Sequence, residues 1–273
     1  MDAALVQRFV GDGFVKLDQA VPRDVIDACV DLLWAETGAD PDDPSTWTRP
    51  VVWVGGMSQE PFVHAVNVPV LHDAFDALVG PGRWAARNSI GSFPLRFPHP
   101  VEPPDAGWHI EGSYEVPGTS GYWTNIHSRA RVLLMLFLFT EVDEGDAPTR
   151  IRVGSHWDVP PVLLPYGDRG EHGHRLSPRV DAASAHRPVA LATGGPGDVY
   201  VCHPFLVHAA QPNHGRRPRF LGQPGLPPPP SHEQRPFDLT VVDNEPSPVG
   251  RIIRDGLRHR HTERDETVPA AAS

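Results

Sequence analysis

Apolar residues in the first 80 positions recur at the spacing of amphipathic helices. Three segments carry apolar side chains three and four residues apart, which is the period of one helix face. Their apolar positions are Leu5, Val6, Phe9 and Val10; Val25, Ile26, Cys29, Val30, Leu32 and Leu33; and Val70, Leu71, Phe75 and Leu78. Asn67 is the expected cap of the third helix and Gly80 its expected stop. We therefore predict that residues 1–80 are mostly helical.

The pattern changes near residue 84 to short apolar stretches that glycine and proline interrupt. The predicted strands are residues 84–93, 108–110, 131–139, 149–153, 189–192, 198–202, 205–209, 219–221 and 238–242. Residues 131–139 are almost wholly apolar, as expected of a strand that is covered on both faces. Many short strands joined by turns predict a jelly roll or barrel. The expected fold is therefore mainly β with flanking helices, with a jelly-roll core over residues 84–245.

The length and charge of the chain limit its class. At 273 residues it can form one domain with a substantial core. We predict a single domain over residues 1–257 and a flexible polar tail over residues 258–273. The net charge of -10 disfavours nucleic acid or an anionic membrane as the main partner. A secretory signal and an apolar run long enough to span a bilayer are both missing from the sequence, so we expect a cytoplasmic protein.

The two cysteines exclude some kinds of site. Cys29 and Cys202 lie far apart, and neither belongs to a CxxC motif. This spacing disfavours a disulfide scaffold and a zinc site made of cysteines.

The most informative polar residues are His109 and Glu111. They stand two apart on a predicted strand, so their side chains point to the same face. An imidazole nitrogen and a carboxylate oxygen can then bind one metal ion. A second histidine from a distant strand would complete a facial triad of two histidines and one carboxylate, which leaves positions open on iron(II).

Composition alone does not distinguish this pair. With 15 histidines and 34 acidic residues in the chain, about two His-x-Asp/Glu pairs are expected by chance. The other two pairs are His156/Asp158 and His261/Glu263. Context must therefore choose among the three.

Further short motifs occur before and after His109 in a definite order. They are Phe9-Val-Gly-Asp-Gly-Phe14-Val, Trp108-His109-Ile110-Glu111, Glu144-Gly145-Asp146-Ala147-Pro148-Thr149, Val153-Gly154-Ser155-His156, Gly197-Asp198, Leu206-Val207-His208, Asn213 and Arg219. Each is weak alone. Together, their order and spacing resemble the phytanoyl-CoA dioxygenase branch of the iron(II)- and 2-oxoglutarate-dependent oxygenases, over roughly residues 5–222. The resemblance implies a double-stranded β-helix core of the jelly-roll or cupin kind.

The resemblance also implies a metal site and a reaction. His109, Glu111 and His208 would bind Fe(II), and Arg219 would pair with the distal carboxylate of 2-oxoglutarate. The keto acid would chelate the iron through its other end, and O2 would take the remaining position. The implied reaction releases succinate and CO2 and hydroxylates a small-molecule substrate, with secondary metabolites as one such class.

Two further residues are candidates for the cosubstrate pocket. Thr149 matches a threonine of the family, although an ordinary strand threonine is an equal alternative. Arg96 lies thirteen residues before His109. It is expected to pair with 2-oxoglutarate or with an acidic substrate, and a surface salt bridge is the alternative.

Residues 112–128 are expected to form a long loop directly after Glu111, and loops of that length often act as lids. Trp123 and Asn125, with His127, are the candidates for contact with substrate. The alternative is a loop packed by its own aromatic residue. His172 and His174 have spacing that a zinc site can use, but their glycine-rich surroundings favour a solvated loop.

Three other histidines compete for the metal. His156 lies in the Gly-Ser-His segment, where the family does not ordinarily place an iron ligand, so a structural histidine is expected there. His261 belongs to the charged tail. His203 and His208 are five residues apart and face opposite sides of a regular strand, and the spacing to Arg219 favours His208.

Glu111 departs from the family, which usually has Asp at this position. The extra methylene moves the carboxylate by about one bond length, and metal sites tolerate only small errors in distance. The retained carboxylate argues against halogenation, because halogenases of this superfamily lack it. Two alternatives stay open: a cupin-like metalloenzyme that does not use 2-oxoglutarate, and a catalytically degenerate binding protein on the same fold. The sequence predicts no oligomeric state.

Overall fold

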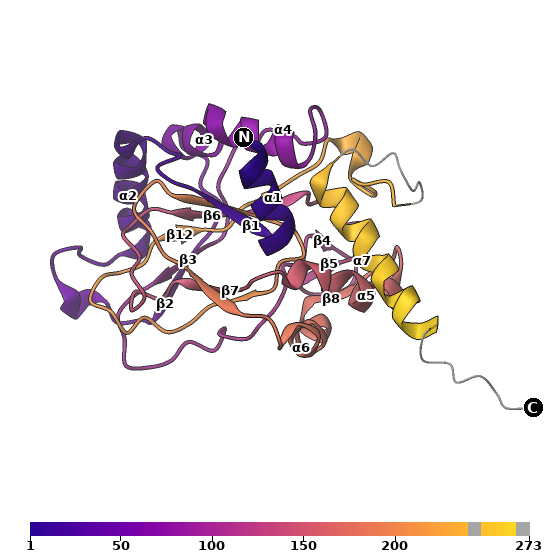
Figure 1. Ribbon diagram of the computed structural model, residues 1–273. Coiled ribbons are helices and arrows are strands. Elements are labelled where there is room, and N and C mark those ends of the chain that lie inside the picture. Colours follow the sequence, from indigo (N-terminus) through magenta and orange to yellow (C-terminus); the bar gives the residue numbers. More distant parts are fainter. Residues whose placement is uncertain (240–246, 266–273) are drawn as a thin grey trace, which may run out of the picture.

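The centre of the protein consists of antiparallel strands, and helices pack around them (Figure 1). The computed structural model describes residues 1–239 and 247–265, with side chains described up to residue 257. The α-helices of this part are α1 (Ala3–Asp12), α2 (Arg23–Thr37), α3 (Glu60–Val66), α4 (Pro69–Leu78), α5 (Val159–Leu163), α6 (Gly173–Ser184) and α7 (Pro248–Asp265). None of these helices has the length and hydrophobicity needed to cross a membrane.

The strands form one large sheet, a second sheet and smaller extensions. They are β1 (Phe14–Leu17), β2 (Val51–Val54), β3 (Phe93–Arg96), β4 (Tyr114–Glu115), β5 (Tyr122–Thr124), β6 (Leu133–Leu138), β7 (Thr149–Arg152), β8 (Glu171–His172), β9 (Val189–Ala192), β10 (Val199–Cys202), β11 (His208–Ala209), β12 (Leu221–Gly222) and β13 (Gly225–Leu226). The large sheet has the order β1-β10-β6-β12, and β13 also pairs with β6. The second sheet has the order β11-β7-β9, and β4-β5-β8 form a third.

Two isolated bridges connect these sheets to further segments and position the candidate site. The β2-β3 pair joins the region of β12 through a bridge between Arg96 and Arg219. The segment around His109 joins β11 through a bridge to His208. Both bridges therefore bring residues from distant parts of the sequence to directly opposite positions.

Strand β6 is apolar throughout because both of its faces are buried. Leu134, Leu136 and Leu138 pack in the cluster that also contains Ile151 of β7 and Ala192 of β9, between the two sheets. The alternate side chains of β6 belong to the other core cluster, which holds the buried residues of α2, α3 and α4. The strand is thus covered on both faces, as predicted. The jelly-roll core with a helical N-terminal region, predicted from the pattern of short strands, is confirmed.

Several predicted elements coincide with observed ones. Helices α1, α2 and α4 cover the three amphipathic segments, and β6, β7, β9 and β10 fall in four of the predicted strands. The prediction that Asn67 caps α4 is wrong, because α4 is preceded by Val68. Asn67 follows α3 instead, and its Nδ2 donates to the carbonyls of Val63 and Arg87. Helix α4 ends at Leu78, just before Gly80, which has a positive φ of 105°.

The prediction for the N-terminal region missed two strands. Strand β1 adds to the edge of the large sheet beside β10, with Val15 and Leu17 buried, and β2 pairs with β3. Both are only four residues long. A strand of that length beside strong helical patterns gives too few alternating positions to be recognised.

Other predicted strands have different limits in the structure. Residues 84–92 are irregular, with bends and a single isolated bridge from Ile90 to Met57, and the strand begins only at Phe93. Residues 108–110 contribute a single bridge, and β11 and β12 are shorter than predicted. A turn in which the amide of Leu206 donates to the carbonyl of His203 delays the start of β11.

Near the C-terminus the structure tests the predictions only in part. Of the predicted strand 238–242, residues 238 and 239 are not in a strand, and 240–242 lie outside the described residues. Helix α7 continues to Asp265, so residues 258–265 of the predicted flexible tail are helical. Residues 266–273 of that tail lie outside the described residues.

Asp198 connects the turn before β10 to strand β1. Its carboxylate accepts hydrogen bonds from the amides of Gln19 (2.8 Å) and Gly195 (3.0 Å) and from Lys16 Nζ (3.0 Å). The side chain is buried, so these donors have no ready replacement. The Gly197-Asp198 motif therefore has a structural role in this protein.

We expect Asp198→Ala to lower the free energy of unfolding by about 2–4 kcal/mol, because it leaves two part-buried amides without their acceptor and removes the buried one of the two carboxylates that pair with Lys16. Urea denaturation measures this change. The control is Asp18→Ala, which removes the exposed second partner of Lys16 and should change stability by no more than about 0.5 kcal/mol. Equal effects of the two substitutions would contradict the assignment.

Candidate metal centre

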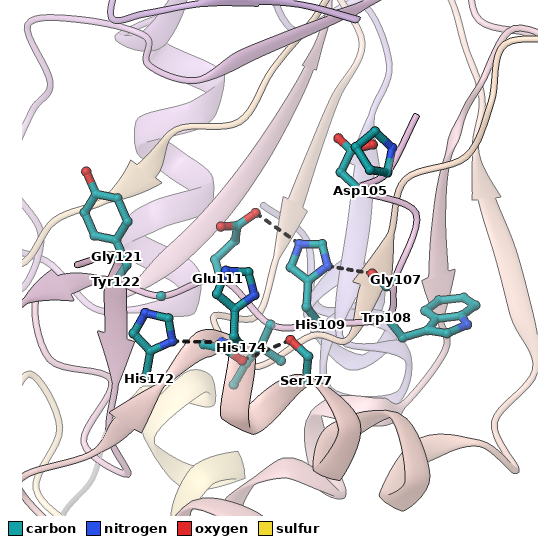
Figure 2. A pocket seen from close by; sticks show the side chains of 14 residues that line it. Asp105, Gly107, Trp108, His109, Glu111, Gly121, Tyr122, His172, His174 and Ser177 are labelled. Atoms are coloured by element: carbon teal, nitrogen blue, oxygen red, sulfur yellow. Dashed lines mark hydrogen bonds and ion pairs between the residues drawn. The ribbon is translucent and has the colours of Figure 1, made fainter. Parts of the chain in front are cut away.

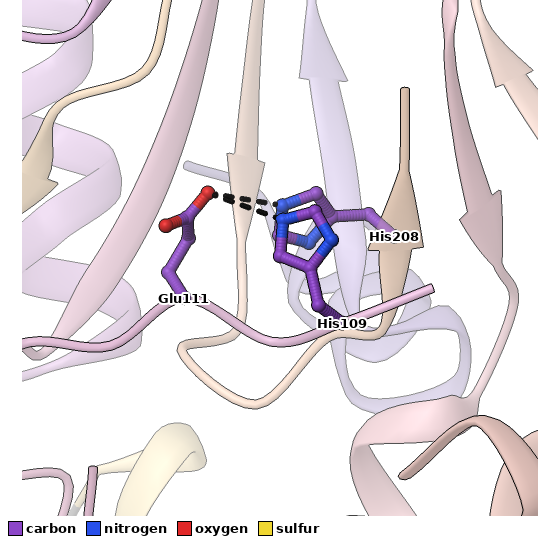
Figure 3. A group of neighbouring side chains, drawn as sticks. All are labelled: His109, Glu111 and His208. Atoms are coloured by element: carbon purple, nitrogen blue, oxygen red, sulfur yellow. Dashed lines mark hydrogen bonds and ion pairs between the residues drawn. The ribbon is translucent and has the colours of Figure 1, made fainter. Parts of the chain in front are cut away.

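The bridge between His109 and His208 places two imidazoles side by side. The amide of His109 donates to the carbonyl of His208, and the amide of His208 donates to the carbonyl of His109, both at 3.0 Å. Directly opposite residues of an antiparallel pair project their side chains to the same face. The two ring centroids lie 4.6 Å apart. Glu111 follows His109 by two residues and points back to the same face (Figure 3).

The three side chains converge on one point. Glu111 Oε1 lies 3.3 Å from His208 Nε2 and 3.6 Å from His109 Nε2. All three potential ligand atoms lie within 4.8 Å of one another. Ligands at right angles around a metal, each about 2.1 Å from it, lie about 3 Å apart. The observed spacings therefore fit a metal ion after small rotations of the side chains.

Backbone carbonyls determine which imidazole nitrogen is available to a metal. His109 Nδ1 donates to the carbonyl of Gly107 at 2.8 Å, and His208 Nδ1 donates to that of Leu206 at 3.0 Å. These contacts assign the ring proton to Nδ1 in both residues. Nε2 of each ring then faces Glu111. A proton on either Nε2 is donated to the carboxylate, and a metal ion would take the place of that proton.

The electrostatics favour the ionised carboxylate. Burial opposes ionisation of Glu111, but hydrogen bonds and charge from His109 and His208 outweigh it and hold the pKa of Glu111 well below its ordinary value. Burial also opposes protonation of His109, but Glu111 outweighs it and raises the pKa of His109. The carboxylate is thus in the form that binds metals. No other group of three His, Cys, Asp or Glu side chains in the described part of the chain is close enough to hold a metal.

The competing histidine pairs have structural surroundings. His156 is completely buried in a short 3-10 helix, its Nε2 donates to the carbonyl of Val10, and burial lowers its pKa to about 3. Asp158 binds Arg187 through both carboxylate oxygens. His203 is also buried and packs on His156, with ring centroids 5.1 Å apart. The side chains of His261 and Glu263 lie outside the described residues.

Arg96 and Arg219 form a second buried feature, which we call the arginine pair. Each is only 1% exposed, and the backbone bridge places them opposite each other. Arg219 donates from Nη1 to the carbonyl of Ala147 (2.9 Å) and from Nη2 to that of Pro94 (2.9 Å). Arg96 Nη2 binds Asp105 at 2.5 Å. Arg96 therefore makes a salt bridge from the interior to a half-buried carboxylate.

The arginine pair has unmet hydrogen-bonding capacity. Arg96 Nε and Nη1 and Arg219 Nε are buried without a hydrogen-bond partner. Burial, followed by the charge of Arg96, lowers the pKa of Arg219 well below its ordinary value, although Asp105 opposes this. Only one carboxylate, Asp105, pairs with these two buried cations. A second anion bound there would therefore be stabilising.

Thr149 relates the arginine pair to the metal ligands. Its Oγ1 lies 3.5 Å from Arg219 Nη1. Ile151 pairs with His208, and Thr149 is two residues before Ile151 on β7. Thr149 therefore shares the face of the second sheet on which His208 lies. Thr149, with the guanidinium of Arg219 beside it, thus lies on the same side of this sheet as the imidazole of His208.

A cavity of about 450 Å³ lies beside the metal ligands. His109 and Glu111 line it, together with Tyr122 of β5, His172 of β8 and His174 of α6 (Figure 2). His172 and His174 were predicted in a solvated loop, and the structure corrects this. His172 belongs to β8, which pairs with β5, and its Nε2 donates to the carbonyl of Ser120 at 2.8 Å. A strand of two residues leaves no recognisable pattern in the sequence.

The predicted substrate residues of the loop make contacts within the protein. Trp123 is buried in β5, and its Nε1 donates to Thr119. Asn125 is buried as well, and its side chain bonds to the backbone of His127 and Arg129 and to the carbonyl of Asp168. His127 Nε2 contacts the carboxylate of Asp168. Of strand β5, it is the neighbouring Tyr122 that lines the cavity, and no pattern in the sequence indicates this residue.

Comparison with known proteins concerns the fold. No family model matches the sequence, and no curated protein matches it either. Among solved structures, the chain is similar to the non-haem α-ketoglutarate-dependent carbocyclase SnoK from nogalamycin biosynthesis, with 18% identity, 82% of each chain covered and a TM-score of 0.57. It is also similar to HygX from Streptomyces hygroscopicus with nickel and 2-oxoglutarate bound, with 13% identity, 84% of this chain and 88% of that chain covered and a TM-score of 0.55.

A third similar structure is the non-haem α-ketoglutarate-dependent epimerase SnoN, with 13% identity, 81% of this chain and 79% of that chain covered and a TM-score of 0.51. The resemblance of the sequence to the phytanoyl-CoA dioxygenase branch in particular stays a prediction. What the comparisons establish is that this chain has the jelly-roll fold of 2-oxoglutarate-dependent oxygenases.

Proposed function

We propose that the protein is a non-haem Fe(II)- and 2-oxoglutarate-dependent oxygenase that hydroxylates a small molecule. The observation that carries the proposal is the convergence of His109, Glu111 and His208, with both Nε2 atoms turned toward the carboxylate. Three protein ligands on one face leave positions open for a bidentate keto acid and for oxygen, which is the arrangement of the facial-triad oxygenases.

The arginine pair supports 2-oxoglutarate as the cosubstrate. A carboxylate fits the donor set, because the pair offers buried N–H groups without partners. Arg219 would hold the distal carboxylate of the keto acid. Arg96 would donate to the same carboxylate while it keeps its salt bridge to Asp105. Thr149 adds a hydroxyl beside Arg219. These are the residues that a dicarboxylic cosubstrate requires in addition to the metal ligands.

Each part of the site then has a definite role. Iron(II) with a chelated keto acid supplies oxygen activation and oxidation of the substrate. The two histidines and Glu111 hold the metal on one face, and the arginine pair orients the cosubstrate. The 450 Å³ cavity beside His109 and Glu111 offers room for a small organic substrate.

Anaerobic titration tests the proposal. Protein loaded with iron(II) should develop the weak visible charge-transfer band of a chelated keto acid when 2-oxoglutarate is added. Succinate is the control, because it has the same carboxylates but no keto group and should give no band. A folded, iron-loaded protein without a band in 2-oxoglutarate would contradict the proposed function.

A metalloenzyme that uses the same ligands without a keto acid is the second candidate. The observation that favours it is that Arg219 already donates to two backbone carbonyls and Arg96 already pairs with Asp105. On this alternative the arginine pair is structural. It predicts metal binding without a keto-acid band and turnover that does not need 2-oxoglutarate.

A further inference from the structure

A second cavity, of about 360 Å³, adjoins the first. Glu111, Gly112 and Tyr122 line both cavities, so the second one opens beside the metal ligands. Its remaining walls come from residues 87–92, from Arg131 just before β6 and from the segment that contains β13. A ligand in the first cavity can therefore extend into the second.

Two arginines distinguish the second cavity. Arg131 Nη2 donates to the carbonyl of Gly112 at 2.8 Å, and its Nη1 is buried without a partner. Arg87 donates from Nε to the carbonyl of Ser89 (2.9 Å) and from Nη1 to that of Gly225 (2.5 Å). These backbone contacts hold both guanidinium groups in place, and they leave the positive charges without a counterion.

The two charges repel each other, and neither Arg87 nor Arg131 makes an ion pair with a carboxylate in the described part of the chain. Burial lowers the pKa of both, and the charge of Arg87 lowers that of Arg131 further while Glu111 opposes it. Glu111 is turned toward the two histidines. A bound metal would share its charge, and the arginines would then keep even less compensation.

The polarity of the two cavities differs. Arg87, Arg131, Ser92 and Gln223 contribute polar side chains to the second cavity, whereas no arginine or lysine lines the first. The cosubstrate residues Arg96 and Arg219 line neither. The protein thus has two separate pairs of arginines near one metal site. Asp105 is the one carboxylate bound to the pair of Arg96 and Arg219, and the pair of Arg87 and Arg131 has none in the described part of the chain.

We propose that the substrate carries a carboxylate or a phosphate group that binds between Arg87 and Arg131 while its oxidised carbon lies in the cavity beside His109 and Glu111. This inference rests on the proposed oxygenase function and specifies the chemical class of its substrate. The two arginines offer charge-assisted hydrogen bonds from fixed positions, and an anion of either kind is the ligand that such a pair binds best.

The test measures anion binding to the protein loaded with iron(II) and 2-oxoglutarate under anaerobic conditions. Inorganic phosphate and acetate serve as probes, and calorimetry gives the dissociation constant of each. We expect at least one of them to bind, and we expect Arg87→Met and Arg131→Met each to weaken that binding about tenfold or more. Binding of phosphate alone assigns a phosphorylated substrate, and binding of acetate alone assigns a carboxylic acid.

Controls separate this inference from the proposed function. Arg216→Met removes the same charge from an exposed position and should leave anion binding within about twofold. Arg87→Met serves where Arg131→Met does not fold, and the keto-acid band shows in each variant that the metal site is intact. Binding of neither probe, or binding that both substitutions leave unchanged, overturns the inference while the band still supports the oxygenase. A loss of 2-oxoglutarate affinity in Arg87→Met also overturns the inference, because Arg87 and Arg131 would then bind the cosubstrate and not the substrate.

Discussion

Replacing His208 with alanine is expected to weaken iron(II) binding by more than about a hundredfold, since loss of a residue that merely orients a ligand already costs 10–100-fold. The substitution removes one of the three side chains that converge on the candidate metal position. His203, five residues earlier in the chain, cannot replace it, because His203 packs on His156 in the interior. Glu111 would then face His109 alone.

The measurement is an anaerobic iron(II) titration, followed by addition of 2-oxoglutarate. Wild-type protein should show the keto-acid band and His208→Ala should not. The matched control is His214→Ala, which removes an exposed histidine near the same sheet and should leave the titration unchanged. Because the backbone bridge between positions 109 and 208 does not depend on the side chain, the variant should keep its fold, as circular dichroism would show. Iron binding of wild-type strength in His208→Ala would refute the metal assignment.

The second large effect is expected at Arg219. Arg219→Lys should raise the KM for 2-oxoglutarate about tenfold to a hundredfold while it leaves the affinity for iron(II) within about twofold. A lysine keeps the charge but offers a point donor in place of a planar fork, and a buried carboxylate loses one charge-assisted hydrogen bond. Lysine also keeps one donor for the carbonyls of Pro94 and Ala147, which alanine would leave unpaired.

Succinate release at varied 2-oxoglutarate concentration gives the KM, and the iron titration gives the metal affinity. Arg216→Lys is the control at an exposed position two residues before Pro218 and should change neither quantity. Unchanged turnover in Arg219→Lys, together with independence from 2-oxoglutarate, would favour the metalloenzyme that does not use a keto acid. A loss of both metal and keto acid would indicate instead that Arg219 supports the fold.

The sequence predicts the parts of this site that are periodic or close together in the chain. His109 and Glu111 follow from the alternation of a strand, and the apolar run of β6 indicates a covered strand in the core. His208 and Arg219 do not follow from local pattern. They become candidates only through the order of several motifs, because backbone pairing brings them to His109 and Arg96 from far along the chain.

Other features of the site have no signal in the sequence. Arg87 and Arg131 are isolated basic residues, and they meet because turns around β3 and β13 pack against the start of β6. His172 reaches the cavity through a pairing of two residues with β5. Such positions depend on tertiary packing, which overrides local preference, so neither periodicity nor composition predicts them.

The paired backbone hydrogen bonds between His109 and His208 mean that the geometry of the metal site depends on the register of the two segments. A slip of one residue would place His109 opposite Val207 or Ala209 and would turn one imidazole to the far side of the sheet. In the correct register, both imidazoles are aligned before any metal arrives. The entropy lost in aligning them is therefore part of the folding free energy, and metal capture begins from a pre-organised site.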